Sequence, residues 1–121
     1  MGGAVRVGET IRGSYRYDPS TPDTNDPPEF GAYVHTSGNA GITINTKKLV
    51  FQTDPNNVNF VIGIGDNNSG QDAYTLISRN NLPLANGFQV GDISWQLVDS
   101  TGTALSSDTL PTTAPRLADY Q

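Results

Sequence analysis

Apolar and polar residues alternate along several short stretches of the chain. In residues 10–17, Ile11, Tyr15 and Tyr17 occupy one face, and threonine, arginine and serine occupy the other. This period of two is typical of a half-buried β-strand. The same pattern is clearest at residues 58–64 and 93–99, and it predicts shorter strands at 32–35, 42–45, 49–51 and 73–78.

Turn-forming residues separate these stretches. Glycine, asparagine, aspartate and proline gather at residues 38–41, 45–48, 54–57, 66–70, 80–83 and 100–103. The segment 18–30 holds four prolines, which predicts a long Pro/Asp-rich loop, and the proline-punctuated segment 106–121 is expected to be irregular. No window of helical length has apolar residues at the required spacing. The sequence predicts one all-β domain over residues 1–121, an antiparallel β-sandwich, jelly-roll-like or Ig-like, with long Pro/Gly/Asn-rich loops.

The strand faces predict a core. Its expected members are Ile11, Tyr15, Ile42, Ile44, Phe51, Phe60, Ile62, Ile93, Trp95 and Leu97. Trp95 lies between Ile93 and Leu97 on one face, so its replacement by alanine is expected to cost about 3–5 kcal/mol.

Composition narrows the functional classes. The 121 residues carry a net charge of −5 without a basic patch, so nucleic acid and anionic lipid are disfavoured as partners. No apolar run has transmembrane length, so membrane insertion is not expected. Cysteine is absent, and residues 1–3 (MGG) are compatible with an expression remnant that replaces a signal peptide.

Candidate catalytic chemistry is sparse. His35 is the only histidine, and no Gly-x-Ser-x-Gly element accompanies it. A Ser-His-Asp triad would need this residue as its base. A structural or surface role is favoured, and no enzyme is predicted.

Carboxylates gather in the loops. Asp18, Asp23, Asp26 and Glu29 lie within twelve residues and could bind calcium, which prefers oxygen-rich loops. The alternative, which is favoured, is that aspartate and asparagine form turns there. No other cofactor is predicted.

Aromatic residues suggest a possible sugar site. Tyr33 and Tyr74 lie near predicted loops, and Asp66, Asn67 and Asp72 could supply polar contacts. Aromatic faces bind the apolar faces of sugars, and neighbouring polar groups confer specificity. Core packing is the competing interpretation, and it is favoured for Trp95.

Several short sequence segments resemble the body domain of secreted bacterial proteins that carry a PEP-CTERM (exosortase-recognised) sorting tail. They are residues 13–18 (GSYRYD), 21–23 (TPD), 31–33 (GAY), 93–99 (ISWQLVD) and 101–112 (TGTALSSDTLPT). The resemblance implies export, a β-rich body and a place at the cell surface or in the extracellular matrix, with no catalytic residues. The sorting tail itself is absent, and the family's body usually continues beyond the position of Tyr120.

Three functions compete. The first is a non-catalytic structural or adhesive domain of a bacterial surface or matrix protein, the second is a carbohydrate-binding module, and the third and least favoured is a hydrolase. If a further strand of the body is missing, a sheet edge is left open to a strand from a neighbour. Residues 4–7 (AVRV) alternate in the manner of a strand and could be the donor. Self-association and polysaccharide are therefore the expected partners.

Overall fold

The computed structural model describes residues 6–24, 30–37, 39–68 and 70–120. In this part of the chain it contains β1 (Arg12–Arg16), β2 (Phe30–His35), β3 (Gly41–Asn45), β4 (Val50–Gln52), β5 (Phe60–Asn68), β6 (Gln71–Ser78), β7 (Ile93–Asp99) and the short 3-10 helix η1 (Leu117–Asp119). Within the described residues, no helix has the length and apolar character needed to cross a membrane.

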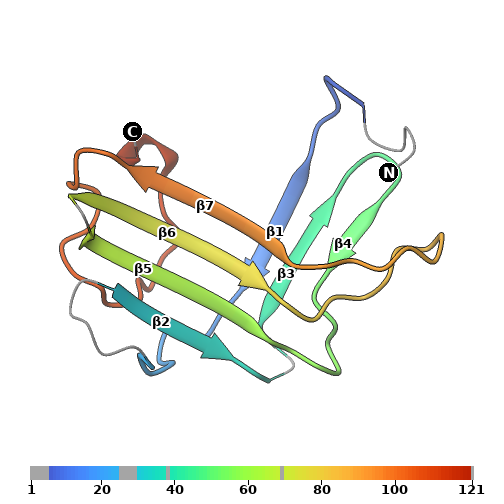
Figure 1. Ribbon diagram of the computed structural model, residues 1–121, viewed down its shortest axis with the longest axis horizontal. Coiled ribbons are helices and arrows are strands. Elements are labelled where there is room, and N and C mark those ends of the chain that lie inside the picture. Colours follow the sequence, from blue (N-terminus) through green and yellow to red (C-terminus); the bar gives the residue numbers. More distant parts are fainter. Residues whose placement is uncertain (1–5, 25–29, 38, 69, 121) are drawn as a thin grey trace.

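The strands form two antiparallel sheets, which confirms the predicted β-sandwich. The smaller sheet has the order β1-β3-β4 and the larger has the order β2-β5-β6-β7. Figure 1 shows the smaller sheet crossing the larger one at a steep angle. Because the strands cross in this way, the two inner faces meet over only part of their area.

One predicted loop is a strand. The polar segment that begins at Asp66 was expected to leave the sheet, but β5 continues through it to Asn68. The β5–β6 ladder shifts register between Gly65 and Asn68 and then resumes with Asn68 opposite Gln71. An irregularity of this kind lets polar residues stay paired at the end of a strand.

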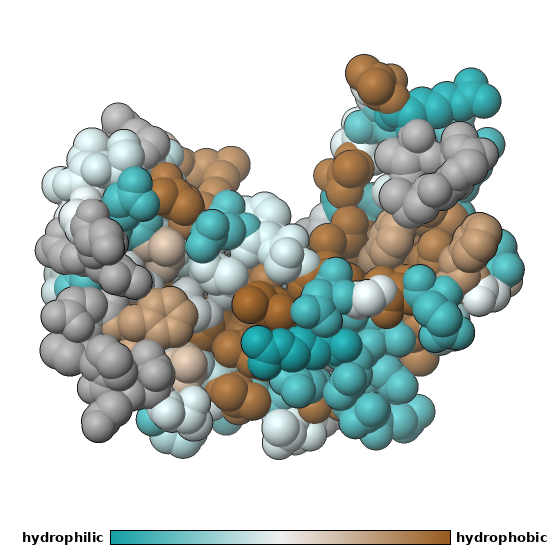
Figure 2. All heavy atoms as spheres, viewed as in Figure 1, coloured by the Kyte–Doolittle hydropathy of each residue, from teal (hydrophilic) through white to brown (hydrophobic). Residues whose placement is uncertain are grey.

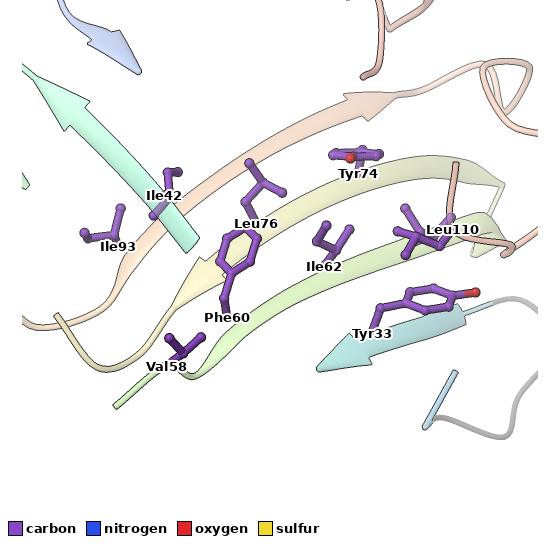
Figure 3. Close-up of a cluster of buried hydrophobic side chains, with 10 residues drawn as sticks. Tyr33, Ile42, Val58, Phe60, Ile62, Tyr74, Leu76, Ile93 and Leu110 are labelled. Carbon is purple, nitrogen blue, oxygen red and sulfur yellow. The ribbon is translucent and has the colours of Figure 1, made fainter. Parts of the chain in front are cut away.

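The core lies where the two sheets meet (Figure 3). Of the predicted core residues, Ile42, Phe60, Ile62 and Ile93 are buried, and Tyr15, Ile44, Phe51 and Leu97 pack against them while partly buried. The remaining buried members of the cluster are Tyr33, Val58, Ile64, Tyr74, Leu76 and Leu110.

Two core predictions are wrong. Ile11 is 60% exposed and Trp95 is 38% exposed. Ile11 precedes β1, and Trp95 lies on β7, which is an edge of the larger sheet. Their apolar faces are on the expected side, but the sheets diverge there and leave them incompletely covered. Trp95→Ala should therefore cost less than the about 3–5 kcal/mol of a fully packed aromatic residue such as Phe60.

The segment that follows β7 returns to both sheets. The Tyr17 hydroxyl donates to the Pro111 carbonyl at 2.7 Å, and the Tyr33 hydroxyl donates to the Asp108 carbonyl at 2.5 Å. Leu110, between these two carbonyls in sequence, is buried in the core. This close approach needs a residue without a side chain at Gly31, where a Cβ atom would lie 2.5 Å from the Asp108 oxygen.

We therefore expect Gly31→Ala to destabilise the fold by about 1–3 kcal/mol, the usual cost of overpacking. Gly91→Ala is the matched control, because a Cβ atom at Gly91 would meet nothing within 4 Å. Urea unfolding of both variants measures the difference. Equal stability of the two variants would contradict the close approach of the Asp108 carbonyl to β2.

Candidate functional site

His35 is a buried structural residue. Its Nδ1 lies 3.1 Å from the Tyr33 carbonyl and 3.2 Å from the Phe60 carbonyl, and its Nε2 lies 3.1 Å from the Asp18 amide and 3.0 Å from Thr21 Oγ1. Carbonyl oxygens only accept, so these partners assign the proton to Nδ1 and leave Nε2 as the acceptor. Both ring nitrogens are thus engaged in fastening the Pro/Asp-rich loop to β2. These contacts favour the structural interpretation over a catalytic base.

The described carboxylates of the predicted calcium loop bond to the chain's own donors. Asp18 Oδ1 accepts from the Ser20 amide at 2.9 Å and from Ser20 Oγ at 2.6 Å, and these bonds lower the pKa of Asp18. Asp23 Oδ1 accepts from the Ala32 amide at 2.9 Å. Asp26 and Glu29 lie outside the described residues. Calcium in this loop stays a prediction, and among the described residues no group of three or more acidic or histidine side chains is placed to hold a metal.

The predicted sugar platform is wrong in its aromatic part. Tyr33 is 4% exposed and Tyr74 is 0% exposed, so neither ring can stack on a sugar. The Tyr74 hydroxyl lies 3.0 Å from the Tyr15 hydroxyl, and burial raises the pKa of Tyr74 far above its ordinary value. Both tyrosines belong to the core because β2 and β6 direct them between the sheets. Asn67 lies in β5.

The structure brings together other acidic residues at the end of the larger sheet. Asp72 and Asp99 are directly opposite on the β6–β7 ladder, and both are fully buried. Like charges in this arrangement repel each other. Asp99 is compensated by the turn that follows it, because its carboxylate accepts five hydrogen bonds, from the amides and hydroxyls of Thr101 and Thr103 and from the Ala104 amide. These bonds, led by the Thr101 hydroxyl, hold the pKa of Asp99 well below its usual range.

The buried carboxyl group of Asp72 is stabilised in a different way. Its Oδ2 accepts from the Leu105 amide at 2.6 Å, and its carboxyl group lies near enough to that of Asp66 to affect the pKa of Asp66. Desolvation first, and then the charge of Asp72, raises the pKa of Asp66. Asp66 and Asp72 were predicted as polar ligands for a sugar, and in the structure they lie at the same end of the larger sheet, where the charge of Asp72 acts on Asp66.

This pair predicts a pH dependence of stability. Because folding raises the pKa of Asp66, its contribution is complete below the unfolded pKa of about 3.8 and is lost as the pH rises through the folded pKa. Asp66→Asn replaces the proton with an amide donor that does not titrate. We expect this variant to melt at a higher temperature than the wild type at neutral pH and to lose that advantage below pH 4. Thermal melts of both proteins across this range measure the effect, and a destabilised variant at neutral pH would contradict the raised pKa of Asp66.

The hydrogen bonds between the central strands determine which backbone amides and carbonyls point outward at the edges of the larger sheet. The Arg79 amide donates to the Asn59 carbonyl at 3.0 Å, which continues the β5–β6 ladder by one residue beyond Phe60 opposite Ser78. Residues whose backbone groups point to one side alternate along an antiparallel strand. The odd-numbered residues of β6 therefore bond to β5, and the even-numbered residues bond to β7.

The β2 edge is covered. By the same alternation, the backbone groups of Ala32 point away from β5. The Ala32 amide donates to Asp23 Oδ1, and the Ala32 carbonyl accepts from the amide of Thr24 at 2.9 Å and from its hydroxyl at 3.1 Å. The Pro/Asp-rich loop thus occupies the position that a further strand would take.

The β7 edge is open. Its register with β6 leaves the amides and carbonyls of Ser94, Gln96 and Val98 pointing outward, and no described residue bonds to them. The seven residues of β7 contain no proline, lysine or arginine, which are the usual protection of an edge strand. The smaller sheet ends in the arginine-bearing β1 and in the three-residue β4. Within the described chain, β7 is therefore the long unprotected edge.

An apolar groove lies beside this edge, between the two sheets. It has a volume of about 250 Å³ and is lined by Ile11, Gly13, Ser14, Tyr15, Ile42, Ile44, Leu76 and Trp95. Figure 2 shows the molecule hollowed into a notch here, with hydrophobic atoms on the side that carries the N-terminal strand. The groove explains the exposure of Ile11 and Trp95, because both lie on its rim.

Comparison of the chain with protein-family models, with curated proteins and with solved structures found no match. The candidate site therefore depends on its own geometry, which comprises the open β7 edge and the groove beside it. The sequence predicted pairing through an open sheet edge but did not identify β7 as that edge. The absence of proline and basic residues from 93–99 was a usable signal, but strand order was needed to show that β7 is an edge.

Proposed function

We propose that the chain is a non-catalytic structural or adhesive domain of a bacterial surface or matrix protein, and that it assembles by accepting a strand at the β7 edge. The observation that carries the proposal is the row of outward amides and carbonyls at Ser94, Gln96 and Val98. Addition of a strand to such an edge is an established form of protein recognition, in which backbone bonds supply affinity and side-chain pockets supply specificity.

The groove supports the same function. An added strand presents every second side chain to the inner face of the sheet, where Trp95 and Ile11 are incompletely covered. Burying apolar surface at this position would stabilise the complex by about 25 cal/mol for each Å² removed from water. The edge and the groove are adjacent, so one extended segment can use both.

Composition and resemblance support the location and the absence of catalysis. Charged residues make up only 16% of the chain and cysteine is absent, a composition compatible with an extracellular domain. The resemblance to exported PEP-CTERM-type bodies points to the cell surface or matrix. Both nitrogens of His35 are held by structural hydrogen bonds, which argues against its use as a general base.

Proline at the β7 edge tests the proposal. Gln96→Pro removes an outward amide that has no described partner, so strand addition should fail while the β6–β7 ladder persists. Val34→Pro is the matched control, because Val34 occupies the corresponding outward position on β2 and is 37% exposed. We expect light scattering to show assembly for the wild type and Val34→Pro and a monomer for Gln96→Pro, with unchanged circular dichroism.

A wild-type protein that remains monomeric well above micromolar concentration would contradict assembly. Assembly that survives in Gln96→Pro would place it at another surface. Ser94→Pro provides a second variant of the same kind, should Gln96→Pro unfold the domain.

A carbohydrate-binding module is the second candidate, and the exposure of Trp95 favours it. A partly exposed indole beside Tyr15 and the Ser14 hydroxyl offers an apolar face next to a polar group. Such a combination suits the stacking of a sugar ring. Retardation of the protein in native gels that contain polysaccharide, abolished by Trp95→Ala, would support this candidate over assembly.

A further inference from the structure

Given the proposed strand addition, we infer that the added strand is β7 of a second copy. The two β7 strands run antiparallel across a two-fold axis at Gln96, so the two four-stranded sheets become one continuous sheet. This inference depends on the proposed function and names its partner.

The backbone fixes the register. Only Ser94, Gln96 and Val98 present outward groups within β7, so hydrogen-bonded pairs must be made between these residues. With Gln96 opposite Gln96, Ser94 of each copy lies opposite Val98 of the other. Each of these pairs exchanges two hydrogen bonds. Shifting the strands by two residues in either direction loses at least one pair, so the centred register uses the edge most completely.

The side chains agree with this register on both faces. On the groove side, Trp95 lies opposite Leu97 of the second copy, and aromatic–aliphatic pairs of this kind stabilise antiparallel strands. Trp95 is 38% exposed in the single chain, and this pairing would cover its outer side. On the other face Gln96 meets its own symmetry mate. Its Nε2 donates to Thr75 Oγ1 at 3.0 Å, and the second N–H and the oxygen of each amide can bond to the other copy.

Charge favours the same partner. Residues Ile93 to Val98 carry no charge, and the carboxylate of Asp99 is occupied by the donors of its own turn. Two β7 strands therefore bring no like charges together. A β1 strand from a second copy would instead carry the charges of Arg12 and Arg16 into the interface. Figure 2 shows a notch beside part of β7, on the side that carries the N-terminal strand.

Charged substitutions at Gln96 test the two-fold pairing. Gln96→Lys and Gln96→Glu each place like charges opposite one another at the axis, and we expect each to weaken dimerisation by about fivefold or more at low salt. Mixing the two variants in equal amounts pairs lysine with glutamate and should restore the dimer as a heterodimer. Gln89→Lys and Gln89→Glu are the matched controls, since Gln89 is an exposed glutamine in a loop. Sedimentation velocity measures all of these proteins.

The outcomes separate the inference from the proposed function. If Gln96→Pro abolishes assembly while the charge variants assemble like the wild type, strand addition stands and the second β7 is excluded as the partner. If a chain lacking residues 1–8 becomes monomeric, the N-terminal segment is the donor and the inference is overturned. If the wild type assembles and Gln96→Pro has no effect, both are overturned. A heterodimer formed only in the mixture supports the two-fold pairing. Added salt should strengthen dimerisation of the wild type, because each chain carries a net charge of −5 and salt screens the repulsion between copies.

Discussion

The direction of the backbone hydrogen bonds in β5 and β6 governs the outer surfaces of the larger sheet. Once Arg79 bonds to Asn59, every second residue of β2 and β7 must turn its amide and carbonyl outward. At both edges these outward backbone groups need hydrogen-bond partners, and the two edges differ in how they are supplied. The loop of residues 18–24 bonds back to Ala32, whereas the outward groups of β7 have no partner among the described residues.

At the far end of the same sheet, two buried carboxylates are stabilised by hydrogen bonds from the chain's own amides and hydroxyls. Asp72 and Asp99 face each other across the ladder, and backbone amides from residues 101–105 bond to both. The turn after β7 is thereby fixed in place by the Asp99 carboxylate. Because this turn follows β7 directly, its bonds to Asp99 hold the last residue of the strand in the sheet.

The sequence was sufficient for the strands but not for their neighbours. Alternation placed β7 at its observed bounds and identified Phe60 and Ile62 as core, because burial on one face leaves a local pattern. The exposure of Trp95 could not be predicted, since it depends on a steep crossing of two sheets that no local pattern records. The candidate site was missed for the same reason, as an edge exists only once strand order is known. The turn after Asp99 was predictable in part, because an aspartate before Ser-Thr-Gly-Thr is a turn signal. The full set of donors to its carboxylate is known only from the fold.

The tyrosine contacts with the segment after β7 have a consequence for the rate at which the domain forms. Tyr17 bonds to Pro111 across 94 positions, and Tyr33 bonds to Asp108 across 75. Contacts between residues so distant in sequence require large loops to close first, and proteins rich in them fold in about milliseconds to seconds rather than microseconds. The sandwich therefore cannot complete itself until this late segment has emerged during synthesis.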